Sequence, residues 1–312
     1  MKRVNLVLIL LSILLVSACS LPGLGAVSEK KSIKIASLSS TEGQILSFMV
    51  EGMVEHYMDV DTQVINNLGS STVNYQALKN GDANVSGVKY TGTSLTGPLG
   101  QEPITDPELA LSTVIEGFDK EFNLKWYPSY GFANTYAFLV TKETAEKYGL
   151  KKVSDLETYA DKMTAGVDSS WIERKGDGYK NFKKTYSFDF NRVYPMQIGL
   201  VYDALEAGEM DVILGYSTDG RIASYDLVVL EDDKNLFPPY DASPVASKEI
   251  LEEYPELDDV LLKLKNSLTQ EKMQQLNYEA DNNLLEPKVV AQKFLEDNHF
   301  FEKSVSNSEG GK

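Results

Sequence analysis

Four tyrosines stand out in this sequence because each lies among glycine, proline or hydroxyl residues in a loop at the end of a strand: Tyr90, Tyr136, Tyr216 and Tyr240. The face of a tyrosine ring attracts cations. It can hold even a trimethylammonium group, which has no N–H to donate. The chain of 312 residues contains 17 tyrosines, and most of the others fall on predicted helices or in polar loops. These four rings are therefore candidates for binding a positively charged ligand.

Residues that could support catalysis are scarce. One cysteine and two histidines exclude a structural zinc site and a disulfide framework, and no cofactor is expected. His56 lies on the apolar face of a helix predicted over 44–58 and His299 ends another, so both are interpreted as structural. The glycine motifs of nucleotide-binding loops and nucleophile elbows are absent from the sequence. Glu42 and Asp219 could pair only if the fold brought them together, so the sequence predicts a protein that is not an enzyme.

The N-terminus has the pattern of a bacterial secretion signal. A basic start and an apolar stretch end in Val16-Ser-Ala-Cys19, which resembles the lipobox whose cysteine is lipidated and becomes the new first residue. We predict a lipoprotein signal peptide over 1–18, a tether over 19–31, and a lipid anchor that holds the protein on the extracytoplasmic face of the cell membrane. A core cysteine in a signal-anchored protein is the alternative. The polar tail 304–312 is predicted to be disordered.

The charge of the chain limits its partners. Lys and Arg number 30 against 46 Asp and Glu, which gives a formal net charge of −16. Such a chain repels phosphate backbones, so nucleic acid is excluded as the main partner. A hydrophobic fraction of 42% provides for a packed core in one or two domains.

An internal echo indicates how the candidate tyrosines are positioned. Predicted strands and helices alternate, which favours an α/β fold with a largely parallel sheet. Segment 75–85 is echoed by 202–212: each copy reads as a helix ended by glycine, an acidic turn and a buried strand, and a tyrosine follows. Two copies predict two similar lobes, although this helix ending is common enough to recur by coincidence. Ligands bind beyond the carboxyl ends of parallel strands, where Tyr90 and Tyr216 would project.

The chain is predicted to cross between the lobes twice, near 129–134 and near 231–237. Two crossings would form a hinge. Lobe one then consists of 32–133 plus 233–303, and lobe two of 134–232. An exported two-lobed protein without catalytic motifs fits a solute receptor that closes on a small molecule.

Three motifs in order carry a resemblance to a known family: Lys89–Leu99, Gly215–Ile222 and Phe237–Val245. Over residues 32–303 the chain resembles the substrate-binding proteins of osmoprotectant ABC transporters, which take up glycine betaine, carnitine, choline and related compounds. The resemblance implies a two-lobed periplasmic-binding-protein fold of type II, with a hinge and a ligand cleft between the lobes. It also implies a monomer that docks, once closed, on a membrane permease with a partner ATPase.

In that family four aromatic side chains, two from each lobe, form a cage around a quaternary ammonium group. The resemblance assigns Tyr90 and Tyr240 to lobe one and Tyr136 and Tyr216 to lobe two. If the family motifs align differently with this sequence, Tyr130 and Tyr202 are the tyrosines that would replace members of the cage.

The resemblance also points to residues that would hold the carboxylate of a betaine: Thr93, Gln44 and Arg174, with Ser40 and Thr41 in the same turn as Gln44. The turn departs from the family spelling Phe-Thr-Glu-Gln because Gly43 stands between the glutamate and the glutamine, which makes the position of Gln44 uncertain. A solvated loop arginine is an equal alternative for Arg174. A neutral Thr93 favours ligands that include carboxylated betaines.

Two other functions stay open on the sequence alone. A receptor for another small solute, such as an amino acid or a polyamine, would share the architecture, and a polyamine site would need carboxylates along the cleft. An enzyme of periplasmic-binding-protein fold, such as a deaminase of pyrrole biosynthesis, would need an internal reactive cysteine, and the sequence has none after Cys19.

Overall fold

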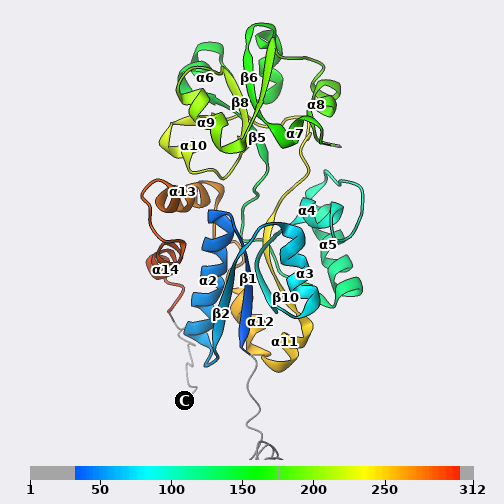
Figure 1. The fold of residues 1–312 in the computed structure, drawn as a ribbon, viewed down its shortest axis with the longest axis vertical. Coiled ribbons are helices and arrows are strands. Elements are labelled where there is room, and N and C mark those ends of the chain that lie inside the picture. The colour runs from blue at the N-terminus through cyan, green and yellow to red at the C-terminus, as the bar shows by residue number, and fades with distance from the viewer. Residues whose placement is uncertain (1–31, 175, 303–312) are drawn as a thin grey trace, which may run out of the picture. The chain divides into compact units, whose positions relative to one another are not determined.

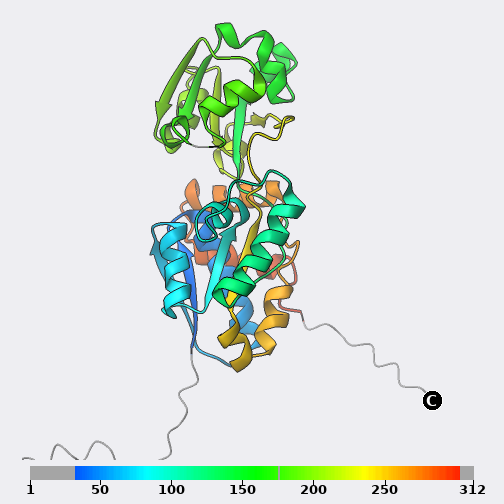
Figure 2. The ribbon, with the colours of Figure 1, turned by 90° about the vertical axis from the view of Figure 1, so that its right-hand side faces the viewer.

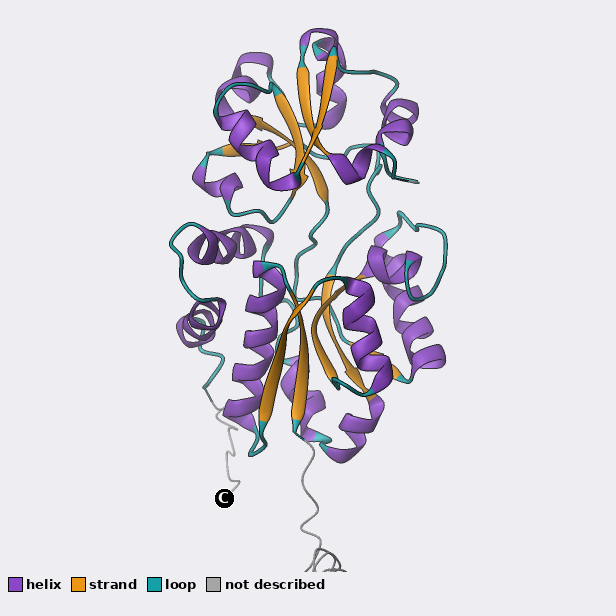
Figure 3. Ribbon diagram, in the orientation of Figure 1, coloured by secondary structure: helices purple, strands orange, loops and turns teal. Residues whose placement is uncertain are grey.

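The computed structural model describes residues 32–174 and 176–302. The predicted signal peptide, the tether with Cys19 and the C-terminal tail lie outside these residues. Within the described part, no helix has both the length and the apolar character needed to cross a membrane. The described chain forms two five-stranded sheets, each with helices packed against it (Figure 3).

The first sheet has the strand order β2-β1-β3-β10-β4 (Figure 1). Its strands are β1 (Ile33–Leu38), β2 (Thr62–Leu68), β3 (Val85–Tyr90), β4 (Leu124–Trp126) and β10 (Ala242–Ser247). Strand β1 is parallel to β2 and β3, whereas β10 is antiparallel to β3 and β4. The accompanying helices are α2 (Thr41–Tyr57), α3 (Ser71–Asn80), α4 (Thr91–Thr96), α5 (Pro107–Phe122), α11 (Lys248–Glu253), α12 (Glu256–Leu262), α13 (Gln270–Asp281) and α14 (Pro287–Asp297).

The second sheet has the order β7-β6-β8-β5-β9. Its strands are β5 (Tyr136–Thr141), β6 (Thr164–Asp168), β7 (Arg192–Met196), β8 (Val212–Tyr216) and β9 (Leu227–Val229). Strand β6 is parallel to β7 and β8, whereas β5 is antiparallel to β8 and β9. The helices are α6 (Lys142–Tyr148), α7 (Ser169–Ile172), α8 (Tyr179–Tyr186), α9 (Ile198–Glu206), α10 (Arg221–Ser224) and the 3₁₀ turns η2 (Val153–Thr158) and η3 (Ala160–Lys162).

The two sheets have the same arrangement of strands, and the repeated segments 75–85 and 202–212 occupy equivalent places in them. In each sheet the echoed strand, β3 or β8, lies between a parallel neighbour and an antiparallel one. The preceding helix ends at a glycine in the left-handed region, Gly81 with φ 75° and Gly208 with φ 72°. The expectation of a largely parallel sheet is confirmed for four strands of each sheet. The fifth strand, β10 or β5, is antiparallel to both its neighbours, and it is the strand by which the chain enters from the other sheet.

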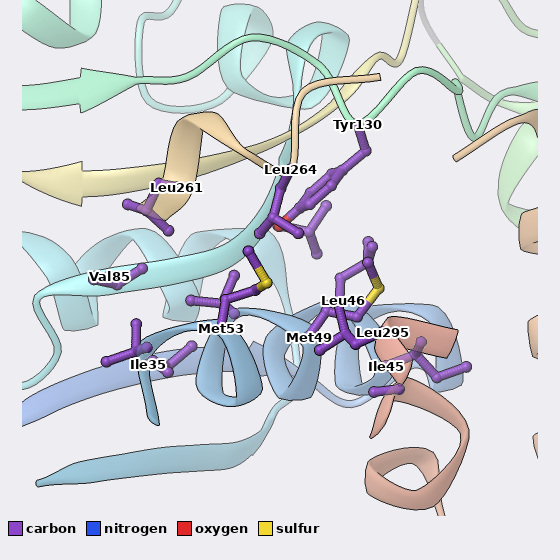
Figure 4. Packing of buried hydrophobic residues seen from close by; sticks show 14 of the residues in the cluster. Ile35, Ile45, Leu46, Met49, Met53, Val85, Tyr130, Leu261, Leu264 and Leu295 are labelled. Carbon is purple, nitrogen blue, oxygen red and sulfur yellow. The ribbon is translucent and has the colours of Figure 1, made fainter. Parts of the chain in front are cut away.

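Apolar spacing along α2 builds the core of the first lobe. The helix begins after Ser40, whose hydroxyl accepts from the backbone N–H of Gly43 at 3.2 Å. Its inward face carries Ile45, Met49 and Met53, which are fully buried against β1, β3 and α12 (Figure 4). Helices α3 and α5 form a smaller cluster against the sheet, and Figure 2 shows α5 in front of it. Both faces of the sheet are therefore covered.

The chain passes from the first sheet to the second between β4 and β5, and it returns between β9 and β10. The two connecting segments pair with each other: Ala133 forms an antiparallel bridge with Asp241, and the Asn134 N–H donates to the Tyr240 carbonyl at 3.1 Å. The connections fall where a hinge is expected. The lobe boundaries given above stay a prediction.

Lys89 on β3 is a buried cation, only 3% exposed, whose ammonium lies 5.8 Å from the centre of the Tyr75 ring. Burial lowers the pKa of Lys89 to about 7. The unfolded chain therefore binds more protons than the folded one between pH 7 and 10.5, so stability rises with pH across that window.

We expect Lys89→Met to stabilise the protein at pH 7 by about 2 kcal/mol, because it removes the cost of burying this amine. Thermal unfolding at pH 7 and at pH 10.5 measures the effect, which should shrink at the higher pH. Lys79→Met is the matched control, since exposed Lys79 lies 6.0 Å from the same Tyr75 ring. Equal melting temperatures for Lys89→Met and the unsubstituted protein at pH 7 would contradict this account.

Candidate functional site

Tyr136 and Tyr216 face each other at one end of the second sheet. Tyr136 begins β5, Tyr216 ends β8, and the two residues are partners in the antiparallel ladder. Their ring centroids are 5.2 Å apart and the ring planes are inclined by 37°. The Tyr136 hydroxyl donates to Asp168 Oδ2 at 2.7 Å, and burial raises the pKa of Tyr136 above its ordinary value. The pair is thus a neutral aromatic surface with a fixed orientation.

Tyr130 and Tyr202, the two substitutes that the sequence offered, are fully buried and support the structure. Tyr130 packs in the core of the first lobe and donates its hydroxyl to the Gly87 carbonyl. The Tyr202 hydroxyl accepts from the Tyr216 backbone N–H at 2.6 Å and donates to the Tyr216 carbonyl at 3.1 Å. Tyr202 therefore positions the end of β8.

Tyr240 lies in the segment that returns to the first sheet, and Arg174 contacts it from the loop after α7. A guanidinium nitrogen of Arg174 donates to the Tyr240 hydroxyl. The guanidinium carbon is 5.8 Å from the centre of the Tyr240 ring and 5.5 Å from that of Tyr136. Arg174 Nε also donates to Asp177 Oδ1 at 2.7 Å. Burial raises the pKa of Tyr240 to about 12, although the charge of Arg174 opposes this rise. Arg174 thus contacts two of the candidate rings and Asp177, while its side chain remains 36% exposed.

Tyr90 ends β3 and donates its hydroxyl to Glu42 in the first turn of α2. The same carboxylate accepts from Asn134 Nδ2 at 3.0 Å and from Asn277 Nδ2 at 3.4 Å. Burial raises the pKa of Glu42, and these hydrogen bonds lower it in part. A buried carboxylate thus lies beside one of the four candidate tyrosines.

Two pockets adjoin these residues, one with three carboxylates and one in which Arg174 is paired with Asp177. The first is acidic and draws its lining from both sheets: Ser40, Thr41, Glu42, Asn134, Tyr216, Thr218, Asp219, Asn277 and Asp281. The second contains the arginine: Thr93, Thr96, Pro103, Arg174, Asp177, Pro238 and Tyr240.

Of the polar residues predicted to hold a carboxylate, Thr93 and Arg174 line a pocket together, whereas Gln44 does not. Thr93 on α4 lines the second pocket together with Arg174. Gln44 lines neither pocket, because its side-chain amide donates to the Ser39 carbonyl at 3.1 Å. Residues two positions apart in a helix are separated by about 200° around its axis, so Glu42 and Gln44 point in nearly opposite directions. From its sequence position Glu42 is only half of a conceivable carboxylate pair with Asp219, and in the structure both line the first pocket.

Comparison with known proteins identifies the family. Residues 31–297 match the model of the substrate-binding domain of the ABC-type glycine betaine transport system. The chain belongs to this family. It is 53% identical over 296 residues to the carnitine transport binding protein OpuCC of Listeria monocytogenes. The matched region covers 95% of this chain and 96% of that protein. It is 35% identical to EgtU of Helicobacter pylori, an ergothioneine transport permease and binding protein, over 92% of this chain and 51% of that one.

Solved structures give the same result. A crystal structure of a glycine betaine/carnitine/choline ABC transporter is 54% identical and superposes with a TM-score of 0.85, covering 87% of this chain and all of the other. The fold is the two-lobed periplasmic-binding-protein fold of type II, as the sequence predicted. Members of this family are the receptor components of ABC transporters, so the chain is an extracytoplasmic substrate-binding protein and not an enzyme.

Helix α13 of this receptor is hydrogen-bonded to the loop that follows Tyr216. Gln274 Nε2 donates to the Ser217 carbonyl at 2.7 Å, and Asn277 Nδ2 donates to the Thr218 carbonyl at 2.8 Å. The backbones approach so closely that a Cβ on Gly220 would lie 2.6 Å from the Tyr278 nitrogen. These contacts with α13 fix the backbone directly after Tyr216.

We expect Gly220→Ala to destabilise the protein by about 1–3 kcal/mol, because the new methyl group meets backbone atoms that cannot turn aside. Gly199→Ala on α9 is the control, since a Cβ there has no neighbour within 4 Å. Thermal unfolding of both variants tests the contact between α13 and this loop. A Gly220→Ala melting temperature equal to that of Gly199→Ala would show that α13 does not hold this loop.

Proposed function

We propose that this receptor binds a small zwitterion with a quaternary ammonium group in a cage formed by Tyr90, Tyr136, Tyr216 and Tyr240, and that it delivers the ligand to its permease. The observation that carries the proposal is the guanidinium of Arg174, which already lies over two of these rings. A cation is thus accommodated where the cage is expected.

The ligand class follows from the chemistry of the two pockets and from the relatives. Trimethylammonium is held by ring faces and apolar contact, each cation–π contact contributing roughly 0.5–2 kcal/mol. The carboxylate of a betaine would be met by Arg174 and the hydroxyl of Thr93. The carnitine-binding relative, 53% identical, supports the glycine betaine, carnitine and choline class.

A polyamine receptor is the second candidate, because Glu42, Asp219 and Asp281 give the first pocket three carboxylates. Arg221 weakens this alternative, since its guanidinium pairs with Asp219 at 2.8 Å.

Isothermal titration of the full chain in detergent, with glycine betaine, carnitine, choline, proline and spermidine, separates the candidates. We expect heat with the quaternary ammonium compounds and none with spermidine. Binding of spermidine or proline alone would move the assignment to another solute.

The location and partners of the receptor are also part of the proposal. Cys19 would carry the lipid anchor, the chain would act as a monomer, and the permease would be a separate membrane protein with its ATPase. The relative EgtU joins permease and binding protein in one chain, which supports direct docking of the two. Mass spectrometry of the mature N-terminus, and release of Cys19→Ser into the medium, test the anchor. Sedimentation of the detergent-solubilised chain tests the monomer.

A further inference from the structure

Val73 and Leu200 are exposed apolar side chains at equivalent positions of the two lobes. The register that aligns segments 75–85 and 202–212 also aligns Val73 with Leu200. In the structure these two side chains belong to residues that are 48% and 55% exposed. Each residue is the third of its helix, α3 or α9. The lobes therefore present one apolar side chain each, from the same turn of corresponding helices.

The chain around each of these residues is uncharged. Residues 62–78, which form β2 and most of α3, contain no Asp, Glu, Lys or Arg, and neither do residues 193–202, which form most of β7 and the beginning of α9. Charged residues make up 24% of the whole chain. Strands β2 and β7 are the outermost strands of their sheets, where soluble proteins usually place charges that keep other chains away. Interface cores, in contrast, are depleted of charge.

Both uncharged edge segments, 62–78 and 193–202, reach the edge of their sheet where the ligand is expected. Strands β2 and β3 are both parallel to β1, so α3 begins at the edge where β3 ends in Tyr90. Strands β7 and β8 are both parallel to β6, so α9 begins at the edge where β8 ends in Tyr216. The first turn of each helix thus lies on the ligand side of its lobe.

Hydrogen bonds fix the beginning of each helix to the strand that ends in a candidate tyrosine. In lobe one, Ser86 Oγ of β3 donates to Asn74 Oδ1 of α3 at 2.9 Å. In lobe two, the Tyr202 hydroxyl of α9 accepts from the backbone N–H of Tyr216 at 2.6 Å. Because each helix is fixed to its own sheet, closure of the lobes on a ligand would change the distance between the two exposed side chains.

We propose that the uncharged edge segments are the surfaces by which the receptor docks on its permease, with Val73 and Leu200 as the central apolar contacts. The permease offers two equivalent uncharged sockets, one for each lobe. This inference rests on the proposed function, which includes the permease as partner. It goes further because it assigns the docking surface and states the chemistry of the surface that the partner must present.

The equivalence of the two segments determines the kind of partner. A protein that binds both in the same way must itself present two equivalent surfaces, as an assembly of two like subunits does. A lipid surface fits less well, because anionic headgroups attract Lys and Arg and the segments contain neither. Since closure changes the distance between the exposed side chains, only one arrangement of the lobes fits both sockets. The partner can thereby distinguish the ligand-bound receptor from the free one.

The double variant Val73→Glu/Leu200→Glu tests the docking surface. Glutamate is favoured at the third residue of a helix, so both helices should form and the melting temperature should be retained. The full-length variant in detergent should bind glycine betaine with an unchanged Kd. In cells that lack their own copy of the protein, uptake of radiolabelled glycine betaine that depends on the variant should fall about tenfold or more, because docking would bury an unpaired charge.

The double variant Leu109→Glu/Val289→Glu is the matched control. Leu109 on α5 and Val289 on α14 are 55% and 52% exposed, and each is also the third residue of its helix. Both directly follow a charged residue, Glu108 or Lys288, and lie outside the uncharged edge segments. Uptake with this control should equal that with the unsubstituted chain. The single variants Val73→Glu and Leu200→Glu should each reduce uptake, because the partner binds both lobes.

Several results would overturn the docking surface. They are normal uptake with Val73→Glu/Leu200→Glu, equal loss of uptake with the control, or loss with only one of the two single variants. If the first double variant melts early, Val73→Ser/Leu200→Ser takes its place, and normal uptake there has the same meaning. An unsubstituted chain that sediments as a dimer, and a glutamate variant that sediments as a monomer, would assign the segments to contacts between copies of the receptor instead.

The proposed function fails in a different way. An unsubstituted chain that binds no quaternary ammonium compound, or that restores no uptake to the cells, overturns the proposed function. Retained binding and uptake in the unsubstituted chain, with uptake insensitive to both glutamate substitutions, overturns only the docking surface.

Discussion

Replacement of Tyr136 and Tyr216 together by leucine is expected to weaken glycine betaine binding by about a hundredfold or more. Truncation of one central aromatic contact costs roughly 1–3 kcal/mol in binding, and about 1.4 kcal/mol is a tenfold change in affinity. The two rings lie 5.2 Å apart and share a register position in β5 and β8. Leucine retains apolar bulk but has no ring face, so the loss reports the interaction with the cation.

The controls separate ring faces from hydroxyl groups and from stability. Tyr136→Phe with Tyr216→Phe retains both faces, and we expect it to bind within about tenfold of the unsubstituted protein. Tyr148 and Tyr159 are another pair of neighbouring, mutually tilted rings of the second lobe, with ring centroids 4.5 Å apart, and they line neither pocket. Their double leucine variant should bind normally. Titration calorimetry on variants that unfold cooperatively measures all three, and normal affinity of the Tyr136/Tyr216 leucine variant would refute the cage.

The strand-end tyrosines could be predicted from the sequence because local rules position them. A helix stopped by a left-handed glycine, a turn and a buried strand bring Tyr90 and Tyr216 to the same edge of two similar sheets. Alternation along a strand depends on neighbouring residues alone. The antiparallel strand in each sheet was missed, because its pairing is set by chain that returns from the other lobe.

The polar part of the site depends on contacts that the sequence does not encode locally. Glu42 is buried by Asn134 and Asn277, which lie 92 and 235 residues away along the chain. Helix α2 begins at Thr41, three residues before the predicted start, and this places Gln44 within the helix on the side away from the pocket. Arg174 lies in a loop between two short helices, so no periodicity indicates its direction.

Glu42 has a role that follows from its burial and its position. It accepts from the Tyr90 hydroxyl and lines the first pocket with Tyr216, so a ligand cation in the cage would lie near its negative charge. At an effective dielectric constant of about 20, unit charges about 7 Å apart interact by about 2 kcal/mol. We therefore expect Glu42→Gln to raise the Kd for glycine betaine by about thirtyfold at neutral pH.

The pH dependence of binding tests the same carboxylate. Burial raises the pKa of Glu42 above its usual 4.5 in the ligand-free protein, whereas a bound cation favours the ionised form. Binding then releases a proton at pH values around the raised pKa of Glu42 in the ligand-free protein, and affinity rises with pH there. The effect on folding has the opposite sign, because the contribution of Glu42 to stability is fully present below 4.5 and is lost as pH rises through the raised pKa.

Other charged groups around the pocket define the control. Asp281 on α13 also has a raised pKa because of burial, and Asp219 pairs with Arg221 in the same pocket lining. Titrations between pH 4.5 and 8 should show a slope of affinity with pH that Glu42→Gln removes and Asp281→Asn retains. A slope that survives in Glu42→Gln would assign the proton to another group. An unchanged affinity in that variant at neutral pH would show that the rings hold the cation without help from Glu42.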